Sequence, residues 1–141
     1  MSVKQNKVTL QRIFDEVINK GDMSVIPELI APSWSYQTPL GDEFKGTEGF
    51  KQFATMWRTA LPDLKMTVDE VVGEGDTLAA RCTMRGTFKG KLGKIEPTGK
   101  KLNMTFAYFY AYKNGKEAGP PKGFMDMLTF FQQLGIKPPV G

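Results

Sequence analysis

A strictly alternating stretch at residues 101–113 constrains the fold of this 141-residue chain more than any other feature. Apolar side chains occupy every second position there, and mostly small or polar ones lie between them. A period of two fits an extended strand with one buried face and one outer face. The predicted buried face holds Leu102, Met104, Phe106, Tyr108, Tyr110 and Tyr112, and the outer face holds Asn103, Thr105, Ala107 and Ala111.

Neighbouring segments predict partner strands for this one. Residues 78–88 alternate in the same way, and the turn sequence GEGD at 73–76 joins them to a strand that contains Met66 and Val68. Asn114-Gly115 is a strong signal for a two-residue hairpin turn. The segment after it, KEAGPPKG, is predicted to be a poor strand, because its two prolines cannot donate to a hydrogen-bond ladder.

Helical periodicity appears on both sides of these strands. Apolar residues recur at helical spacing over 7–20, 23–30, 48–61 and 124–135, and a short strand is expected over 34–39. This order predicts an α+β fold, with the helices packed on one side of a curved antiparallel sheet. We expect a single domain over 1–141, with its core at about 8–135 and a Pro-rich tail at 136–141.

The composition excludes several classes of chemistry. The chain contains no histidine and a single cysteine, Cys82. Ser-His and Cys-His nucleophiles, histidine-ligated metals, multi-cysteine metal sites and an internal disulfide are therefore excluded. We expect no metal and no cofactor. No apolar run approaches the ~18 residues of a membrane span. The N-terminus shows no signal peptide, so a cytoplasmic location is expected.

Positive charge gathers in one segment of the chain. Residues 85–101 carry six basic side chains against the single acid Glu96, and the net charge of the chain is +4. A basic stripe can bind nucleic acid, but this one is rich in glycine and lacks interleaved aromatic residues. We interpret it as a solvated connection between strands, and we do not expect nucleic acid as a partner.

Several segments together resemble the SnoaL-like polyketide cyclase family, which lies within the superfamily shaped like nuclear transport factor two. The resemblance covers roughly residues 8–135. It rests on RIFDEVINKGDMSVIPELIAPSWSYQTP, GTEGFKQFATMWRTALPDLKMTVDEVVGEGDTLAARCTMRGTFKG, IEPTGKKL, the NGK turn and FMDMLTFFQQLG, in this order and spacing.

The resemblance implies a cone-shaped fold, in which helices pack on a strongly bent sheet and enclose an apolar pocket, usually in a homodimer. It also implies cofactor-free acid/base chemistry, typically an intramolecular aldol ring closure on a polyketide ester. The family's acid/base aspartate lies just before the last helix, where this chain has Asp126. Relatives often carry histidine where Gln37, Phe88 and Tyr110 stand here.

Asp126 has two interpretations. As a catalytic group, it is a carboxylate desolvated by its apolar neighbours, and desolvation would raise its pKa toward that of a useful base. As a structural group, it caps the last helix. Tyr108 and Tyr110 are likewise either ordinary strand aromatics or phenols that donate to a developing enolate oxygen, an arrangement that needs no histidine.

Three functional hypotheses follow, of which the third is a different enzyme on this scaffold that uses the pocket mainly to fold its substrate. The first is an enzyme that cyclises or isomerises a small apolar organic substrate through an enolate, with Asp126, Tyr108 and Tyr110 as catalytic residues. The alternative is a non-catalytic protein that binds a small molecule in the same pocket. A homodimer is expected through the outer sheet face of Arg81, Thr83 and Arg85. Residues expected to contact the substrate are Tyr36, Gln37, Phe53, Trp57, Met84, Met104, Phe106, Phe124 and Met127.

Overall fold

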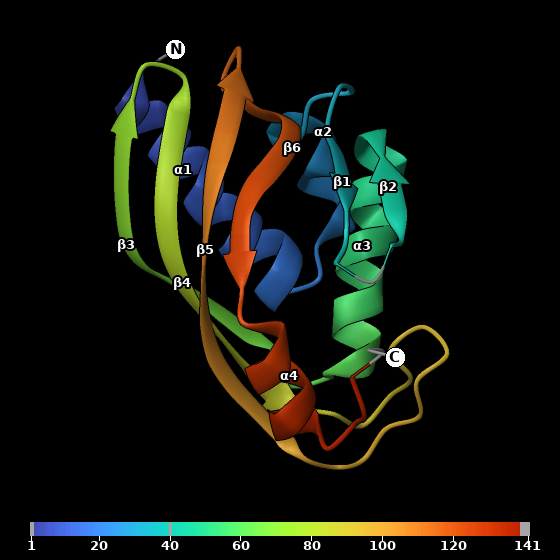
Figure 1. The fold of residues 1–141 in the computed structure, drawn as a ribbon. Helices are drawn as coiled ribbons and strands as arrows, with labels where there is room; N and C mark the ends of the chain where they lie inside the picture. Colours follow the sequence, from blue (N-terminus) through green and yellow to red (C-terminus); the bar gives the residue numbers. More distant parts are fainter. Residues whose placement is uncertain (1, 40, 139–141) are drawn as a thin grey trace.

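A bent antiparallel sheet forms the main wall of the molecule in the computed structural model, which describes residues 2–39 and 41–138. Its order is β3 (Lys65–Glu74), β4 (Thr77–Thr87), β5 (Lys101–Lys113) and β6 (Lys116–Met125). The strands are long and curve toward α4 at one end (Figure 1). The alternation predicted for β5 is confirmed, because its even-numbered residues from Leu102 to Tyr112 are buried and its odd-numbered ones are exposed.

The prediction that KEAGPPKG is a poor strand is wrong, because the whole segment lies within β6. β6 is the last strand of the sheet, so only one of its edges has to bond a neighbour. The register also shifts there: Ala118 pairs with Ala111 and Lys122 with Phe109. Residues 119–121 therefore bulge opposite Tyr110, and Gly119 adopts a positive φ of 66°. The bulge and the free edge together accommodate both prolines.

The helices cover the inner face of this sheet. The first helix, α1 (Val3–Arg12), continues into a π-helical segment, η1 (Ile13–Asn19). After it come a 3₁₀ turn, η2 (Met23–Val25), and a short helix, α2 (Ile26–Leu29). The long helix α3 (Gly46–Ala60) and the final helix α4 (Met127–Leu134) complete the set. The α+β cone expected from the sequence is confirmed (Figure 1).

A small second sheet stands beside α3. It contains β1 (Ser35–Gln37) and β2 (Glu43–Lys45), which form an antiparallel hairpin. β1 lies beside β6, but the hairpin does not join the main sheet (Figure 1). The interior of the molecule therefore lies between the main sheet on one side and α3 with the hairpin on the other.

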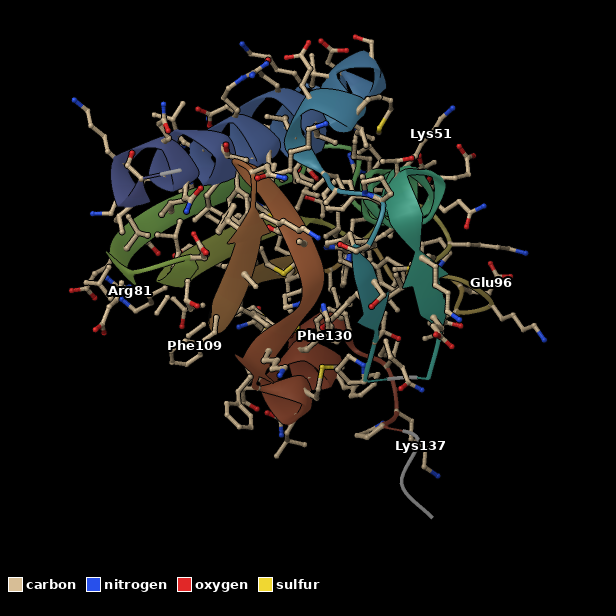
Figure 2. The ribbon with its side chains drawn as sticks, turned by 90° about the horizontal axis from the view of Figure 1, so that it is seen from above. Lys51, Arg81, Glu96, Phe109, Phe130 and Lys137 are labelled. Atoms are coloured by element: carbon tan, nitrogen blue, oxygen red, sulfur yellow. The ribbon has the colours of Figure 1, made fainter. Side chains whose placement is uncertain are left out.

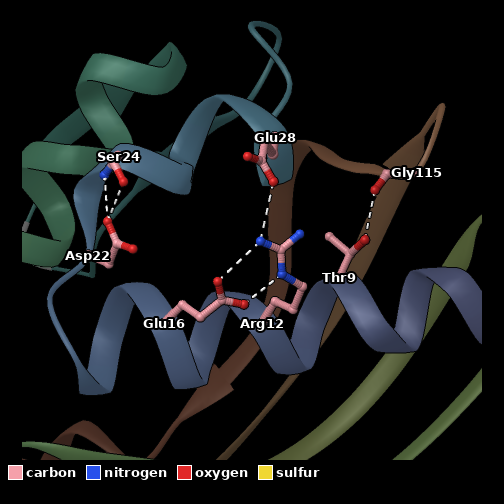
Figure 3. Close-up of polar contacts among 7 residues, drawn as sticks. All are labelled: Thr9, Arg12, Glu16, Asp22, Ser24, Glu28 and Gly115. Carbon is pink, nitrogen blue, oxygen red and sulfur yellow. Dashed lines mark hydrogen bonds and ion pairs between the residues drawn. The ribbon is translucent and has the colours of Figure 1, made fainter.

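Polar contacts fix α1 against its neighbours (Figure 3). Arg12 bonds both Glu16 and Glu28, so α1 is linked to α2. The Thr9 hydroxyl donates to the carbonyl of Gly115 at 2.8 Å. This second contact matters for the interior, because Gly115 lies in the turn between β5 and β6 and so helps to fix where β6 begins.

The basic connection at 88–100 is held to the rest of the protein by buried apolar side chains, while its lysines are exposed to solvent. Phe88 and Leu92 are buried, and the backbone N–H groups of Lys89 and Gly90 donate to the carbonyl of Ala60. Lys89, Lys91, Lys94 and Lys100 are exposed. The segment is thus a solvated connection held at the end of α3. The last residues of the expected tail, 139–141, lie outside the described residues.

Candidate functional site

An apolar cavity of about 130 Å³ lies between the main sheet, the helices and the β1–β2 hairpin. Five of its lining residues are methionines, and the charged ones are the acids Glu117 and Asp42. Ten aromatic side chains supply most of the wall: Phe14, Trp34, Tyr36, Phe50, Phe53, Trp57, Phe106, Tyr108, Tyr110 and Phe130. Figure 2 shows Phe130 near the interior, while Phe109 and Arg81 lie on the outer side of the sheet.

Most of the residues predicted to contact a substrate line this cavity. The alternation of β5 directs Tyr108 and Tyr110 inward, and the same pattern on β4 directs Met84 inward. The predicted residues that line the cavity are Tyr36, Phe53, Trp57, Met84, Phe106, Met127, Tyr108 and Tyr110.

Three predicted contacts are not among the residues that line the cavity. Gln37 is exposed, since it follows the inward-facing Tyr36 on a strand. Phe124 is 87% exposed, because it pairs with Ala107 on the outer face of β5. Met104 faces inward but lies beside a separate shallow groove, which Asp126 also lines.

Asp126 is an exposed helix cap and is not the desolvated carboxyl that the sequence suggested. Its carboxylate accepts the backbone N–H of Thr129 at 3.0 Å and the hydroxyl of Thr129 at 2.7 Å. These hydrogen bonds favour the charged form and lower the pKa of Asp126 below its ordinary value. The neighbouring apolar side chains do not surround it, because Phe124 and Leu128 point into solvent. Asp126 lines the shallow groove and not the apolar cavity.

Of the two carboxyl groups that line the cavity, Glu117 is the buried one and Asp42 is exposed. Glu117 is 3% exposed, and the indole Nε1–H of Trp34 donates to its Oε2 at 2.8 Å. Burial penalises the charged carboxylate and raises the pKa of Glu117 to about 7, although the bond from Trp34 opposes this shift. Within residues 2–39 and 41–138, no basic side chain forms an ion pair with Glu117.

The sequence contained a signal for Glu117 that the motif analysis missed. The two-residue turn at Asn114-Gly115 pairs Lys113 with Lys116, so Glu117 stands opposite Tyr112. Because Tyr112 was predicted to face inward, the hairpin register alone directs Glu117 inward as well. This signal is hidden because Glu117 lies in a charged turn sequence that is followed by two prolines, a pattern typical of a loop.

Two phenols lie side by side on the cavity wall. The hydroxyl groups of Tyr36 and Tyr108 are 2.9 Å apart and share one hydrogen bond. Since the pair has two hydroxyl hydrogens and the shared bond uses one, the other is free to point toward a ligand. Tyr110 lies next to Tyr108, and both burial and the charge of Glu117 raise its pKa. Burial also raises the pKa of Tyr36, so Tyr36 and Tyr110 stay protonated and can act as donors.

Other chemistry-bearing residues lie away from the cavity. Cys82 is buried, and desolvation raises the pKa of its thiol to about 12, so it stays a neutral core residue. Among the described residues, no group of three or more metal-ligating side chains is present. The described helices also include none that is long and apolar enough to cross a membrane.

Solved structures share this fold over nearly the whole chain. TsrD from Streptomyces laurentii has a TM-score of 0.85 at 23% identity, covering 97% of this chain and 99% of its own. A SnoaL-like protein from Jannaschia sp. CCS1 has a TM-score of 0.83 at 22% identity, covering 98% of each chain. IdmH from Streptomyces antibioticus, a candidate polyketide cyclase, has a TM-score of 0.74 at 27% identity and covers 94% of this chain and 99% of its own.

Curated proteins provide no match to this sequence. The family model for SnoaL-like polyketide cyclases, in contrast, matches residues 8–134, which is almost all of the chain. The fold shared with the solved structures agrees with that match, so this chain belongs to the SnoaL-like polyketide cyclase family.

Proposed function

We propose that this protein is a cofactor-free acid/base enzyme that forms an enolate from a small apolar carbonyl compound and then cyclises or isomerises it. The observation that carries the proposal is the buried carboxyl of Glu117 in an aromatic cavity. A carboxyl group with a pKa of about 7 is present in both protonation states at neutral pH. It can therefore accept a proton and return one, as a general acid/base must.

The proton balance of the reaction needs only this chain's own groups. Glu117 takes a proton from the carbon next to the substrate carbonyl, and the electron pair of that C–H bond moves onto the carbonyl oxygen. A phenol of the Tyr36–Tyr108 pair, or Tyr110, donates a hydrogen bond to the resulting enolate oxygen. In a cyclisation the enolate carbon attacks a second carbonyl, the electron pair of that C=O bond moves onto its oxygen, and Glu117 returns its proton to this oxygen. In an isomerisation Glu117 returns the proton to a different carbon of the enolate.

Asp126 is the second candidate for the base, because the family resemblance points to its position. In this chain its carboxylate is an exposed cap with a lowered pKa, which makes it a weak base. We therefore assign the first place to Glu117. The proposal also includes a homodimer through the outer sheet face, which carries Arg81 and Thr83 together with the exposed side chain of Phe109.

Hydrogen–deuterium exchange tests the proposal without knowledge of the natural substrate. Small cyclic ketones such as 1-indanone and 2-tetralone are incubated with the protein in D₂O, and proton NMR follows the loss of the signals next to the carbonyl. We expect the wild type to accelerate this exchange, and Glu117→Gln to slow the catalysed rate by about 10²–10⁴-fold. Asp126→Asn, which keeps a capping side chain, and Asp42→Asn, at the cavity rim, should retain most of it.

Two results would contradict this assignment. If Asp126→Asn abolishes exchange while Glu117→Gln retains it, the base is Asp126. If ketones bind and quench tryptophan fluorescence but never exchange faster than in buffer, the protein is the non-catalytic binding protein of the alternative hypothesis.

A further inference from the structure

The charges that line the cavity all have one sign. Glu117 lies deep in the wall and Asp42 lies at its exposed part, and no lysine or arginine lines the described cavity. The chain as a whole is basic, with a net charge of +4. The cavity is therefore an acidic, apolar interior in a basic protein. An anionic ligand would meet Glu117 with no cation to neutralise it, and burying such a charge pair is costly.

Five aromatic rings form an arc that begins and ends beside Glu117. The arc contains Trp34, Phe53, Tyr36, Tyr108 and Tyr110, with successive centroids 6.0, 5.5, 6.2 and 6.2 Å apart. Trp34, at one end, donates its indole N–H to Glu117. Tyr110, at the other end, lies on the same buried face of β5 as Tyr112, the cross-strand partner of Glu117, and is therefore its diagonal neighbour.

An arc of aromatic rings closed by one carboxylate is a suitable site for an organic cation. The ring faces carry negative electrostatic potential, which attracts alkylammonium groups most strongly where water is excluded. Glu117 would supply the opposite charge that a buried cation needs. The titratable groups that face this carboxyl are Tyr110 and Tyr112. Their raised pKa values keep both phenols neutral, so neither adds a charge beside Glu117.

We propose that the substrate of this cavity carries a cationic nitrogen, a protonated or quaternary amine, on a small apolar body, with the nitrogen held by the aromatic arc beside Glu117. This inference rests on the proposed function in taking the cavity as the substrate site. It also deepens that function, because a cation next to Glu117 favours the ionised carboxylate. The substrate's own charge would thus convert the partly protonated acid into a base.

The size of the cavity fits a body of about one ring. Its volume of about 130 Å³ is close to that of the roughly 150 Å³ cavity that is known to hold benzene. Phenyltrimethylammonium and tert-butylbenzene are a matched pair of probes, which place one group in the cavity and extend through its open part, where Asp42 lies. They share one arrangement of heavy atoms and differ in the charge of the central nitrogen or carbon.

Tryptophan fluorescence measures binding of this pair directly, because both tryptophans of the chain, Trp34 and Trp57, line the cavity. At pH 8 we expect the cation to bind wild-type protein about tenfold or more tightly than its neutral counterpart. Glu117→Gln should reduce the difference in affinity between the two probes to within about twofold, whereas Asp126→Asn should leave it unchanged. Glu117→Leu serves as a second variant if the glutamine variant fails to fold.

Equal or tighter binding of tert-butylbenzene by the wild type would overturn the inference, as would a preference for the cation that survives both Glu117 variants. Neither result bears on the proposed function, because the exchange assay uses neutral ketones. In the opposite case, wild-type protein prefers the cation but does not accelerate exchange. The proposed chemistry is then wrong, and the inferred class of ligand is retained.

Discussion

The free energy of unfolding should fall as the pH rises from about 5 to 8, and Glu117 should be the cause. Its pKa is about 7 in the folded protein, against an ordinary value of 4.5. Below pH 4.5 the acid is neutral in both the folded and the unfolded chain. Between the two pKa values the folded state holds a proton that the unfolded state releases. Stability is therefore lost as the pH rises through 7.

The size of this loss follows from the two pKa values. Their difference corresponds to about 3 kcal/mol of stability, an upper bound for a group whose surroundings can relax. For a chain of 141 residues, this is a fall of roughly 6–12 °C in the melting temperature. The background is favourable, because the chain holds no histidine, the residue that ordinarily titrates in this range.

Urea unfolding at pH 5, 6, 7 and 8 measures this dependence. The Glu117→Gln variant should lose most of the slope, because glutamine has no proton to release. The comparison uses the pH dependence of the free energy of unfolding in each protein. A pH-independent cost of burying the glutamine amide therefore does not affect it. A wild-type stability that stays flat between pH 5 and 8, or a glutamine variant with the same slope as the wild type, would refute the assignment of a raised pKa to Glu117.

Two further predictions concern the outer surface. Asp126→Ala should lower the melting temperature at pH 7 by a few degrees, because the cap to Thr129 is lost. The difference should begin to shrink as the pH falls to 3.8 and should be lost below the lowered pKa of the folded protein, where the carboxyl is protonated in both states. Calorimetry that finds no loss at pH 7 would contradict the capping role. Light scattering at micromolar concentration should return roughly twice the chain mass of 15.7 kDa, and a monomer mass would exclude the homodimer.

The sequence predicted the main wall of the molecule well, because alternation in β4 and β5 reports burial directly. Tyr108 and Tyr110 were placed correctly for this reason. The desolvation considered for Asp126 is not found, because a run of apolar residues does not show which face of a short helix each side chain occupies. Phe124 and Leu128, expected to shield it, are exposed.

β6 and Glu117 were harder to predict, since prolines and a charge usually signal a loop. Whether Pro120 and Pro121 are tolerated depends on β6 being an edge strand with a bulge, which is a property of the whole sheet. The burial of Glu117 depends on Trp34, a residue 83 positions away that supplies its hydrogen bond. The hairpin register places Glu117 on the inner face, but no local pattern identifies Trp34 as its partner.

The separation of the β1–β2 hairpin from the main sheet sets how a ligand could enter. Among the described residues, backbone bonding between the two regions is confined to the base of the hairpin, where the N–H of Ala31 donates to the carbonyl of Glu117. Farther along, side chains hold the hairpin, including the bond between Tyr36 and Tyr108. Displacing the hairpin thus breaks side-chain contacts and leaves the strand ladder intact. Amide hydrogens of residues 35–37 and 43–45 should accordingly exchange by local opening, well before the global unfolding that exposes β4 and β5.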